Sequence, residues 1–232
     1  MKHIRNLVAA AAAVAVTAVV LVPLPASAAT ATIRRGTSVA PAYSGKILAT
    51  LIESVSVTTT LGTATCNTGA IGGTVQSNGT GLNVTSFTFS NNPGPLCPNS
   101  TGGSSTVSPV GLPWLNGTVI YDTGGGRNGV VTLQNVKVSS VTTGWFGTIS
   151  CVYKGSGAGN SIALDAYNPG NTNGPAPSLT EARARAVDFV LNKDSGSLLC
   201  PGTAKYSASF KLLGETTAGS GVFDQTLFLT TP

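Results

Sequence analysis

Carboxylates are the side chains of this sequence best suited to acid–base chemistry, because its only histidine, His3, lies at the extreme N-terminus. Glycoside hydrolases work with a pair of Asp or Glu residues, one acting as the acid and the other as base or nucleophile. Asp122, Asp165 and Asp188 lie near predicted strand ends or loops and could face one cleft. No local motif pairs them, so we predict no catalytic residue and keep a carboxylate-based glycoside hydrolase as an alternative function.

Two tryptophans offer a different chemistry, since an exposed aromatic face can stack on a sugar ring. Trp114 precedes Asn116-Gly117, which we expect to fold "LPWL" back on "TVIY" as a hairpin. Trp145 stands between glycines in "TGWFGT". Packing of both indoles in the core is the favoured interpretation, because aromatic side chains bury the most area there, and a surface role is the alternative. The candidate ligand-binding residues are Trp114, Asn116, Tyr121, Asp122 and Trp145.

The four cysteines could bind a metal or form disulfides. No pair has C-x-x-C spacing, and no histidine beyond His3 can complete a zinc site, so we expect no metal. Two disulfides remain, and four cysteines allow three connectivities. Cys66 and Cys151 each lie in a strand-like run that is followed by a Leu-Cys-Pro unit, so we favour Cys66–Cys97 and Cys151–Cys200. The prolines after Cys97 and Cys200 place these two cysteines at strand ends or edges.

The N-terminus has the three parts of a secretory signal peptide. Basic residues come first, an apolar run follows at 7–22, and Ala26-Ser27-Ala28 fits the cleavage rule. A membrane anchor is the alternative, but the run is shorter than the ~20 residues of a spanning helix. We therefore expect residues 1–28 to be removed and the mature protein to be secreted, with no later membrane span and no histidine for a catalytic triad.

Charge and composition limit the class of partner. Loss of Lys2 and Arg5 with the signal would reduce the formal net charge from +5 to +3, and the remaining basic residues are scattered, so we expect no nucleic-acid partner. Charged residues make up 9% of the chain, and Gly, Ser, Thr and Asn take their place, as is typical of secreted, turn-rich β proteins. We expect a cell-wall or extracellular polysaccharide, or another surface protein, as partner, and no cofactor.

Alternation of apolar and polar residues predicts antiparallel strands through most of the chain. In "AKYSASFKL" (204–212), Tyr206 and Phe210 face one side while Lys205 and Lys211 face the other, which is the pattern of a half-buried antiparallel strand. In "GVVTLQNVKVSS" (129–140) the apolar parity changes, which indicates a bulge or a strand buried on both faces.

Turn residues recur between these runs, as Asn128-Gly129 and "SNGTG" (77–81) show, and each predicts a hairpin. Roughly ten to twelve short strands predict an antiparallel β-sandwich or barrel-like domain, stapled by two disulfides, with at most one short helix. The expected organisation is a signal peptide at 1–28, a flexible arm at 29–36 and a single domain at 37–232 with two cysteine-bridged halves, about 37–110 and 111–232.

One segment, "SLTEARARAVDFVLNK" (178–193), has helical as well as strand character. Ser178 and Glu181 have capping-box spacing, and good helix formers follow them. Arg183 and the residues at alternate positions after it also repeat as they would in a strand. We therefore expect a short helical turn near 179–183 that leads into a strand over 184–191.

Several short motifs occur in a distinctive order between Gly36 and Phe210. They are "GTSV", "SGKILATL", "TATC", "FTFSNN", "GLPW", "ISCVYKG", "VDFVLN" and "SGSLLCPGTAKYSASF". In this order the chain resembles a family of actinobacterial secreted β proteins that carry a signal peptide and four cysteines. The resemblance implies an exported, disulfide-bonded β protein, and it transfers no activity.

These observations predict a secreted, non-enzymatic protein that serves as an extracellular or cell-surface binding module or as a structural one. Two alternatives stay open. One is the carboxylate-based glycoside hydrolase. The other is a secreted protease inhibitor, whose reactive segment would lie on the disulfide-braced loop "NNPGPLCPNS" (91–100).

Overall fold

The computed structural model describes residues 31–177 and 180–232, in which the regular elements are β-strands and one short 3-10 turn, η1 (Gly124–Gly126). The expected all-β class is therefore confirmed. The predicted signal peptide with its cleavage site lies outside the described residues, and so do residues 178–179 of the predicted helical turn.

Eight antiparallel strands close into a barrel. Neighbouring strands are hydrogen-bonded in a continuous circuit that returns to its first member. In order around the circuit these are β15 (Thr203–Glu215), β2 (Gly45–Leu51), β5 (Thr68–Val75), β6 (Leu82–Ser90), β9 (Trp114–Tyr121), β10 (Gly129–Leu133), β13 (Ile162–Tyr167) and β14 (Ala182–Gly196). An eight-stranded barrel of this kind encloses an interior that side chains fill, or that has room for one small ligand.

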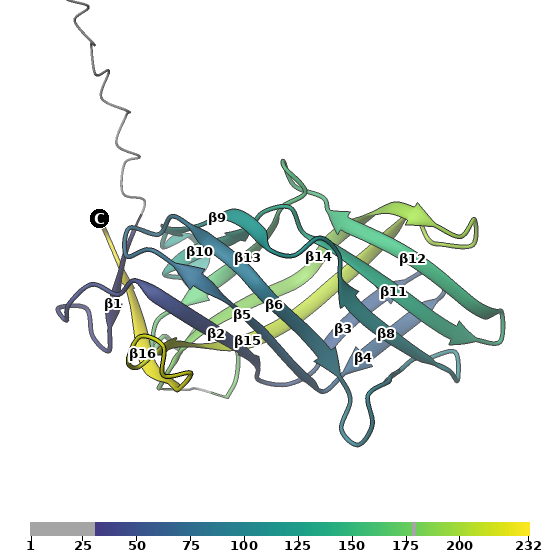
Figure 1. Ribbon diagram of the computed structural model, residues 1–232, viewed down its shortest axis with the longest axis horizontal. Helices are drawn as coiled ribbons and strands as arrows, with labels where there is room; N and C mark the ends of the chain where they lie inside the picture. Colours follow the sequence, from purple (N-terminus) through teal and green to yellow (C-terminus); the bar gives the residue numbers. More distant parts are fainter. Residues whose placement is uncertain (1–30, 178–179) are drawn as a thin grey trace, which may run out of the picture.

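Further strands extend the barrel on one side (Figure 1). β12 pairs with the second half of β14, and β3 pairs with the first half of β15. On the far side, an Ala64–Asn99 bridge and a hydrogen bond from the Ser100 N–H to the Thr63 carbonyl oxygen, at 2.9 Å, connect β4 to the turn after β7. These strands therefore form an outer circuit that also closes through the β14–β15 hairpin. The outer strands are β3 (Val55–Thr59), β4 (Gly62–Cys66), β7 (Cys97–Pro98), β8 (Ser104–Pro109), β11 (Lys137–Gly144) and β12 (Gly147–Gly155).

A bulge in β14 separates the two circuits. Residues 182–186 pair with 208–212 and residues 189–192 pair with 203–206, so the register shifts at Val187 and Asp188. Before the bulge β14 also pairs with β13, and after it with β12. The bulge is therefore the point at which the hairpin passes from the barrel into the outer circuit.

Two strands near the chain ends cover the other end of the barrel (Figure 1). β1 (Thr32–Arg35) pairs with β16 (Phe223–Thr230), which in turn pairs with the end of β15. Ile33, Leu227 and Leu229 are buried and line the interior. Residues 32–35 thus form a strand where the sequence predicted a flexible arm, because Ile33 alternates with polar neighbours and reaches the core.

The hairpin predictions give a mixed result. Asn128-Gly129 lies where the chain turns from β9 into β10, and residues 77–81 connect β5 to β6, as predicted. Asn116-Gly117 forms no hairpin, because β9 runs through it and Asn116 takes a left-handed φ of 66° at a register shift against β6. A Cβ atom on Gly117 would lie 2.6 Å from the Thr132 carbonyl oxygen, so this glycine allows the close approach of β10 at the bulge.

Two further expectations fail locally. The helical turn near 179–183 is absent from its described residues 180–183, since β14 begins at Ala182, whereas the strand over 184–191 is confirmed. The stretch 129–140 is not one strand, because β10 ends at Leu133 and β11 begins at Lys137. The alternation of apolar residues changes parity where the chain leaves the barrel after β10 and enters the outer circuit at β11.

Both disulfides have the predicted connectivity. Cys66–Cys97 joins β4 to β7, and Cys151–Cys200 joins β12 to the β14–β15 connection. Both bonds therefore lie in the outer circuit, where several strands are short.

Removal of either disulfide should destabilise the protein by a similar amount. Loop-closure entropy for separations of 31 and 49 residues gives about 4 kcal/mol for each bond. We expect Cys66→Ala/Cys97→Ala and Cys151→Ala/Cys200→Ala each to lower the free energy of unfolding by this amount, as measured by guanidinium chloride unfolding. The mismatched variant Cys66→Ala/Cys151→Ala should lose both contributions, and an unchanged midpoint in a matched variant would contradict the prediction.

Candidate functional site

The structure brings two of the three candidate carboxylates together through one arginine. The Arg127 guanidinium donates hydrogen bonds to Asp122 and, at 3.0 Å, to Asp165. Asp188 lies on the β14 bulge, where its N–H donates to Ser207 Oγ at 2.9 Å. The hydrogen bond from Arg127 lowers the pKa of Asp122, whereas the general acid of a glycosidase needs a raised pKa. This geometry gives the glycosidase alternative no support.

The candidate ligand-binding residues do not form one surface. Trp114 is 1% exposed, and its indole N–H donates to the Val110 carbonyl oxygen at 3.0 Å. Trp114 is therefore a core residue, because β9 continues through Asn116 and directs the indole into the interior. Trp145 instead lies in the β11–β12 connection and is 83% exposed. Of the predicted set, Asn116 is exposed, whereas Tyr121 is only partly exposed, and both lie on β9.

Four hairpin connections gather at one end of the outer circuit, which we call the hairpin end. Asn99 Nδ2 donates to the Thr143 carbonyl oxygen at 2.8 Å, and the Ser197 N–H donates to the Ser150 carbonyl oxygen at 3.1 Å, so neighbouring connections are joined. In Figure 1 the β11–β12 and β14–β15 tips form the right-hand end of the molecule. None of the residues in the four connections carries a charge. The connections are residues 60–61, 99–103, 145–146 and 197–202.

Large apolar side chains stand open to solvent at the hairpin end. Leu198 is 100% exposed and Leu199 is 61% exposed in the β14–β15 connection, and Trp145 is exposed in the β11–β12 connection. Trp145 packs edge-on against Phe146, with 5.5 Å between ring centroids. Single exposed apolar residues such as Val39 are ordinary, but a group of them on an uncharged surface is typical of an interaction site.

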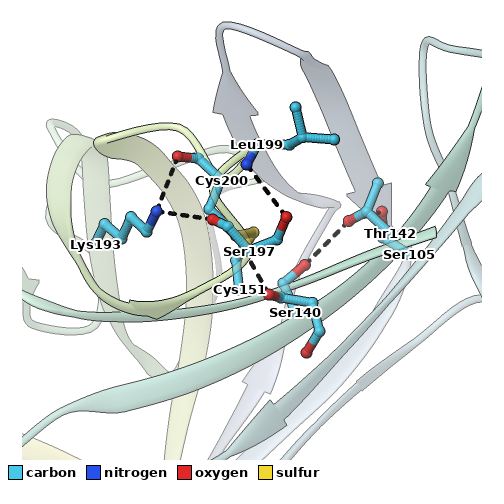
Figure 2. Close-up of a disulfide and its surroundings, with 9 residues drawn as sticks. Ser105, Ser140, Thr142, Cys151, Lys193, Ser197, Leu199 and Cys200 are labelled. Atoms are coloured by element: carbon cyan, nitrogen blue, oxygen red, sulfur yellow. Dashed lines mark hydrogen bonds between the residues drawn. A yellow bond between two sulfur atoms is a disulfide. The ribbon is translucent and has the colours of Figure 1, made fainter. Parts of the chain in front are cut away.

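The loop that carries the two leucines is held rigidly from behind (Figure 2). Cys200 is bonded to Cys151, and the Lys193 ammonium donates to the carbonyl oxygens of Ser197, at 2.8 Å, and of Cys200, at 3.5 Å. The Leu199 N–H donates to Ser197 Oγ at 3.2 Å. The leucine side chains are therefore displayed on a fixed loop, and docking would require little further ordering of its backbone.

Lysines dominate the charge around the base of this loop. Lys205 is exposed on β15, and Lys193 lies under the loop. Asp194 accepts hydrogen bonds from Lys137, at 2.8 Å, and from Lys154, at 2.9 Å, and these two bonds lower its pKa. The group thus contains four lysines and one aspartate, and the aspartate is already neutralised.

The interior contains two cavities. The first, of about 90 Å³, reaches the hairpin end, where Leu61, Phe146 and Pro201 line it, and we call it the hairpin-end cavity. The second, of about 110 Å³, lies in the barrel above β1 and β16 and is lined mainly by aliphatic side chains. The side chains that line both cavities, and so separate them, are Ile71, Leu133 and Leu164.

Polar side chains also line the hairpin-end cavity. Ser105, Ser140 and Thr142, seen beside the disulfide in Figure 2, are joined through their hydroxyls at 3.0 and 3.2 Å. Tyr153 and Tyr206 line the same cavity, and burial raises the pKa of both phenols, so they stay protonated at ordinary pH. The cavity therefore presents neutral hydrogen-bonding groups in an apolar wall.

Leu198, Leu199 and Phe146, which are surface or cavity residues in the structure, were not among the predicted site residues. The signal was present in "SGSLLCPGT", where two leucines stand in a glycine-flanked turn beside Cys200 and Pro201. Apolar residues in a turn that must be exposed are informative in themselves. The repeated Leu-Cys-Pro unit was interpreted only as the position of a disulfide cysteine.

Comparison with known proteins assigns no relative, since no protein-family model, curated protein or solved structure matches the chain. Within residues 31–177 and 180–232, no helix has the length and apolar character needed to cross a bilayer. The same residues contain no cluster of three or more His, Cys, Asp or Glu side chains able to hold a metal ion. The geometry of the hairpin end and of the cavities is therefore the basis for the functional argument.

The two tryptophans should respond very differently to a polar quencher. Trp145 is exposed and Trp114 is buried, so acrylamide should quench only part of the intrinsic fluorescence of the wild type. In Trp145→Phe the remaining emission should be blue and almost resistant to quenching, because only the core indole is left. Efficient quenching in that variant would show that Trp114 is accessible and would contradict its placement in the core.

The pKa of Asp122 should lie below the ordinary aspartate value of 3.8. Because the folded pKa is lowered, the ion pair with Arg127 stabilises the fold above pH 3.8 and is lost as the pH falls through the lowered pKa. NMR titration of the carboxyl resonance measures this pKa directly. Arg127→Gln should move it back upward, whereas Lys137→Gln, which alters the separate Asp194 pair, should leave it unchanged.

Proposed function

We propose that the protein is a secreted, non-enzymatic binding module that docks on a lipid surface through its hairpin end. The observation that carries this proposal is the exposure of Trp145, Leu198 and Leu199 in hairpin connections that contain no charged residue. Secretion follows from the signal-peptide pattern at 1–28 and agrees with two disulfides in one small protein.

Burial of these side chains supplies the energy for docking. Complete transfer of a leucine side chain out of water contributes about 1.5 to 3 kcal/mol, and an indole at a membrane interface adds to this. The disulfide and the Lys193 hydrogen bonds hold the leucine loop in place, so little of that energy would be spent on ordering the chain. Several tips that insert together would give a useful affinity although each one alone is weak.

The surroundings of Trp145 favour lipid over polysaccharide. Recognition of a neutral sugar requires hydrogen-bonding side chains around the aromatic face. The chain neighbours of Trp145 are Gly144, Phe146 and Gly147, which supply none. The lysines around the base of the neighbouring loop suit anionic lipid head groups, which attract basic side chains near a membrane surface.

Vesicle binding tests the proposal. We expect the protein to sediment with phosphatidylcholine vesicles that contain phosphatidylglycerol, and the Trp145 emission to shift to the blue on binding. Leu198→Asp should weaken binding by about tenfold or more, since it removes buried apolar area and adds a charge. Lys205→Gln should lower the affinity for the anionic vesicles by about fivefold.

Val39→Asp provides the matched control. Val39 is 89% exposed in the β1–β2 connection, away from the outer circuit, so the same kind of substitution there should leave vesicle binding unchanged. An equal loss in both variants would indicate a general charge effect. Retention on an insoluble polysaccharide or on a surface protein, without any binding to vesicles, would overturn the choice of lipid.

A further inference from the structure

We propose that the hairpin-end cavity is a binding site for a small, uncharged, largely apolar molecule with an acceptor oxygen, such as a ketone, ester or alcohol, and that Tyr153 and Tyr206 recognise this oxygen. The inference concerns the interior of the protein. It is independent of the proposal that the exterior of the hairpin end docks on lipid.

The shape and lining of the cavity define the size and polarity of the ligand. The cavity has a volume of about 90 Å³, and no charged side chain lines it among the described residues. Apolar protein cavities of comparable size, roughly 150 Å³, stay dry and take up benzene or xenon. The hairpin-end cavity is smaller than this, so a single-ring ligand would have to displace part of its wall, and a carboxylate or ammonium group would find no counter-charge.

Two hydroxyls in this cavity lack the partners that buried polar groups normally have. Tyr153 is 4% exposed and Tyr206 is 7% exposed, and neither phenol hydroxyl has a hydrogen bond to any other part of the described chain. The other two buried tyrosines are satisfied: Tyr43 donates to the Lys46 carbonyl oxygen, and Tyr167 accepts from Arg185 at 2.9 Å. Among the buried tyrosines of the described chain, the two with unpartnered hydroxyls are therefore the two that line the hairpin-end cavity.

The remaining polar side chains of the cavity strengthen the contrast, because each has a partner within the protein. The Thr59 hydroxyl donates to the Gly62 carbonyl oxygen at 3.2 Å, and the Thr63 hydroxyl is 3.0 Å from that of Thr58. The side chains of Asn99, Thr101, Ser105, Ser140 and Thr142 are also hydrogen-bonded. The fully enclosed side-chain atoms without a partner in the described chain are three arginine Nε atoms, so the two unpartnered phenol oxygens retain accessible surface. A ligand with an acceptor oxygen, held in the cavity that these tyrosines line, would supply the partner that they lack.

A matched pair of probes separates recognition of the oxygen from simple filling of the cavity. Acetophenone and ethylbenzene have nearly the same shape, and only acetophenone has an acceptor oxygen. We expect the disulfide-intact protein, labelled with ¹⁵N and titrated by NMR, to bind both probes, with shifts at cavity residues such as Ile149 and Leu191. Tyr153→Phe, Tyr206→Phe or both should weaken acetophenone about fivefold and leave ethylbenzene within twofold.

Tyr121→Phe is the control, because Tyr121 lies on β9 and lines neither cavity, and it should change neither affinity. The melting temperatures of Tyr153→Phe and Tyr206→Phe should equal or exceed that of the wild type, since the deleted hydroxyls have no partner to lose. A lower melting temperature in both variants, no binding of acetophenone at millimolar concentration, or the same affinity for acetophenone in wild type and both variants would each overturn the proposal.

Discussion

The β14–β15 hairpin is the element on which the fold depends, because the barrel and the outer circuit both close through it. The decisive detail is the bulge at Val187 and Asp188. Before it the buried apolar positions are 182, 184 and 186, which are all alanine; after it the buried apolar position is Leu191. Because the bulge adds one residue, side chains of the same sequence parity lie on opposite faces of β14 before and after it. A single strand can therefore form part of the wall of both circuits.

The same bulge explains the placement of Arg183 on the outer face of the barrel. Its guanidinium is 1% exposed and donates to the carbonyl oxygens of Asn171, at 2.6 Å, and Pro175, at 2.8 Å. Burial of a cation is costly unless hydrogen bonds replace its hydration, and the two charge-assisted bonds to carbonyl groups do so for Nη1 and Nη2, whereas Nε has no partner in the described chain. These hydrogen bonds attach the irregular segment 168–177 to β14. They depend on which face of β14 carries Arg183.

The sequence was sufficient for the fold class and both disulfides, because those conclusions rest on local alternation, turn residues and the pairing of each strand cysteine with a Leu-Cys-Pro unit. It was insufficient where a long-range contact decides between local options. Arg183 and Arg185 share sequence parity with Phe189 and Leu191, and only the paired strands reveal that the bulge places them on opposite faces. Asn116-Gly117 is a good turn pair, yet β6 and β10 hold it inside β9.

The candidate site was less predictable for the same physical reason. Trp114 was a candidate binding residue because a hairpin was expected beside it. No hairpin forms there, and Trp114 lies in the core, whereas Trp145 lies in the β11–β12 connection and is exposed. Exposure follows from the turn, and the turn follows from strand pairing. Phe146 and Tyr153 belong to the β11–β12 hairpin and Tyr206 to β15, and they line one cavity only because the strand circuits enclose it.

The covalent cross-links are concentrated in one of the two circuits. The outer circuit contains β7, which is two residues long, and β3 and β4, which are five. Short strands supply few backbone hydrogen bonds, so the β3–β4 and β7 region would otherwise open readily. Both disulfides lie in the outer circuit, together with the hydrogen bonds from Lys193 to the leucine loop. Covalent bonds therefore reinforce the circuit that contains these short strands, and this circuit carries both the exposed apolar tips and the cavity behind them.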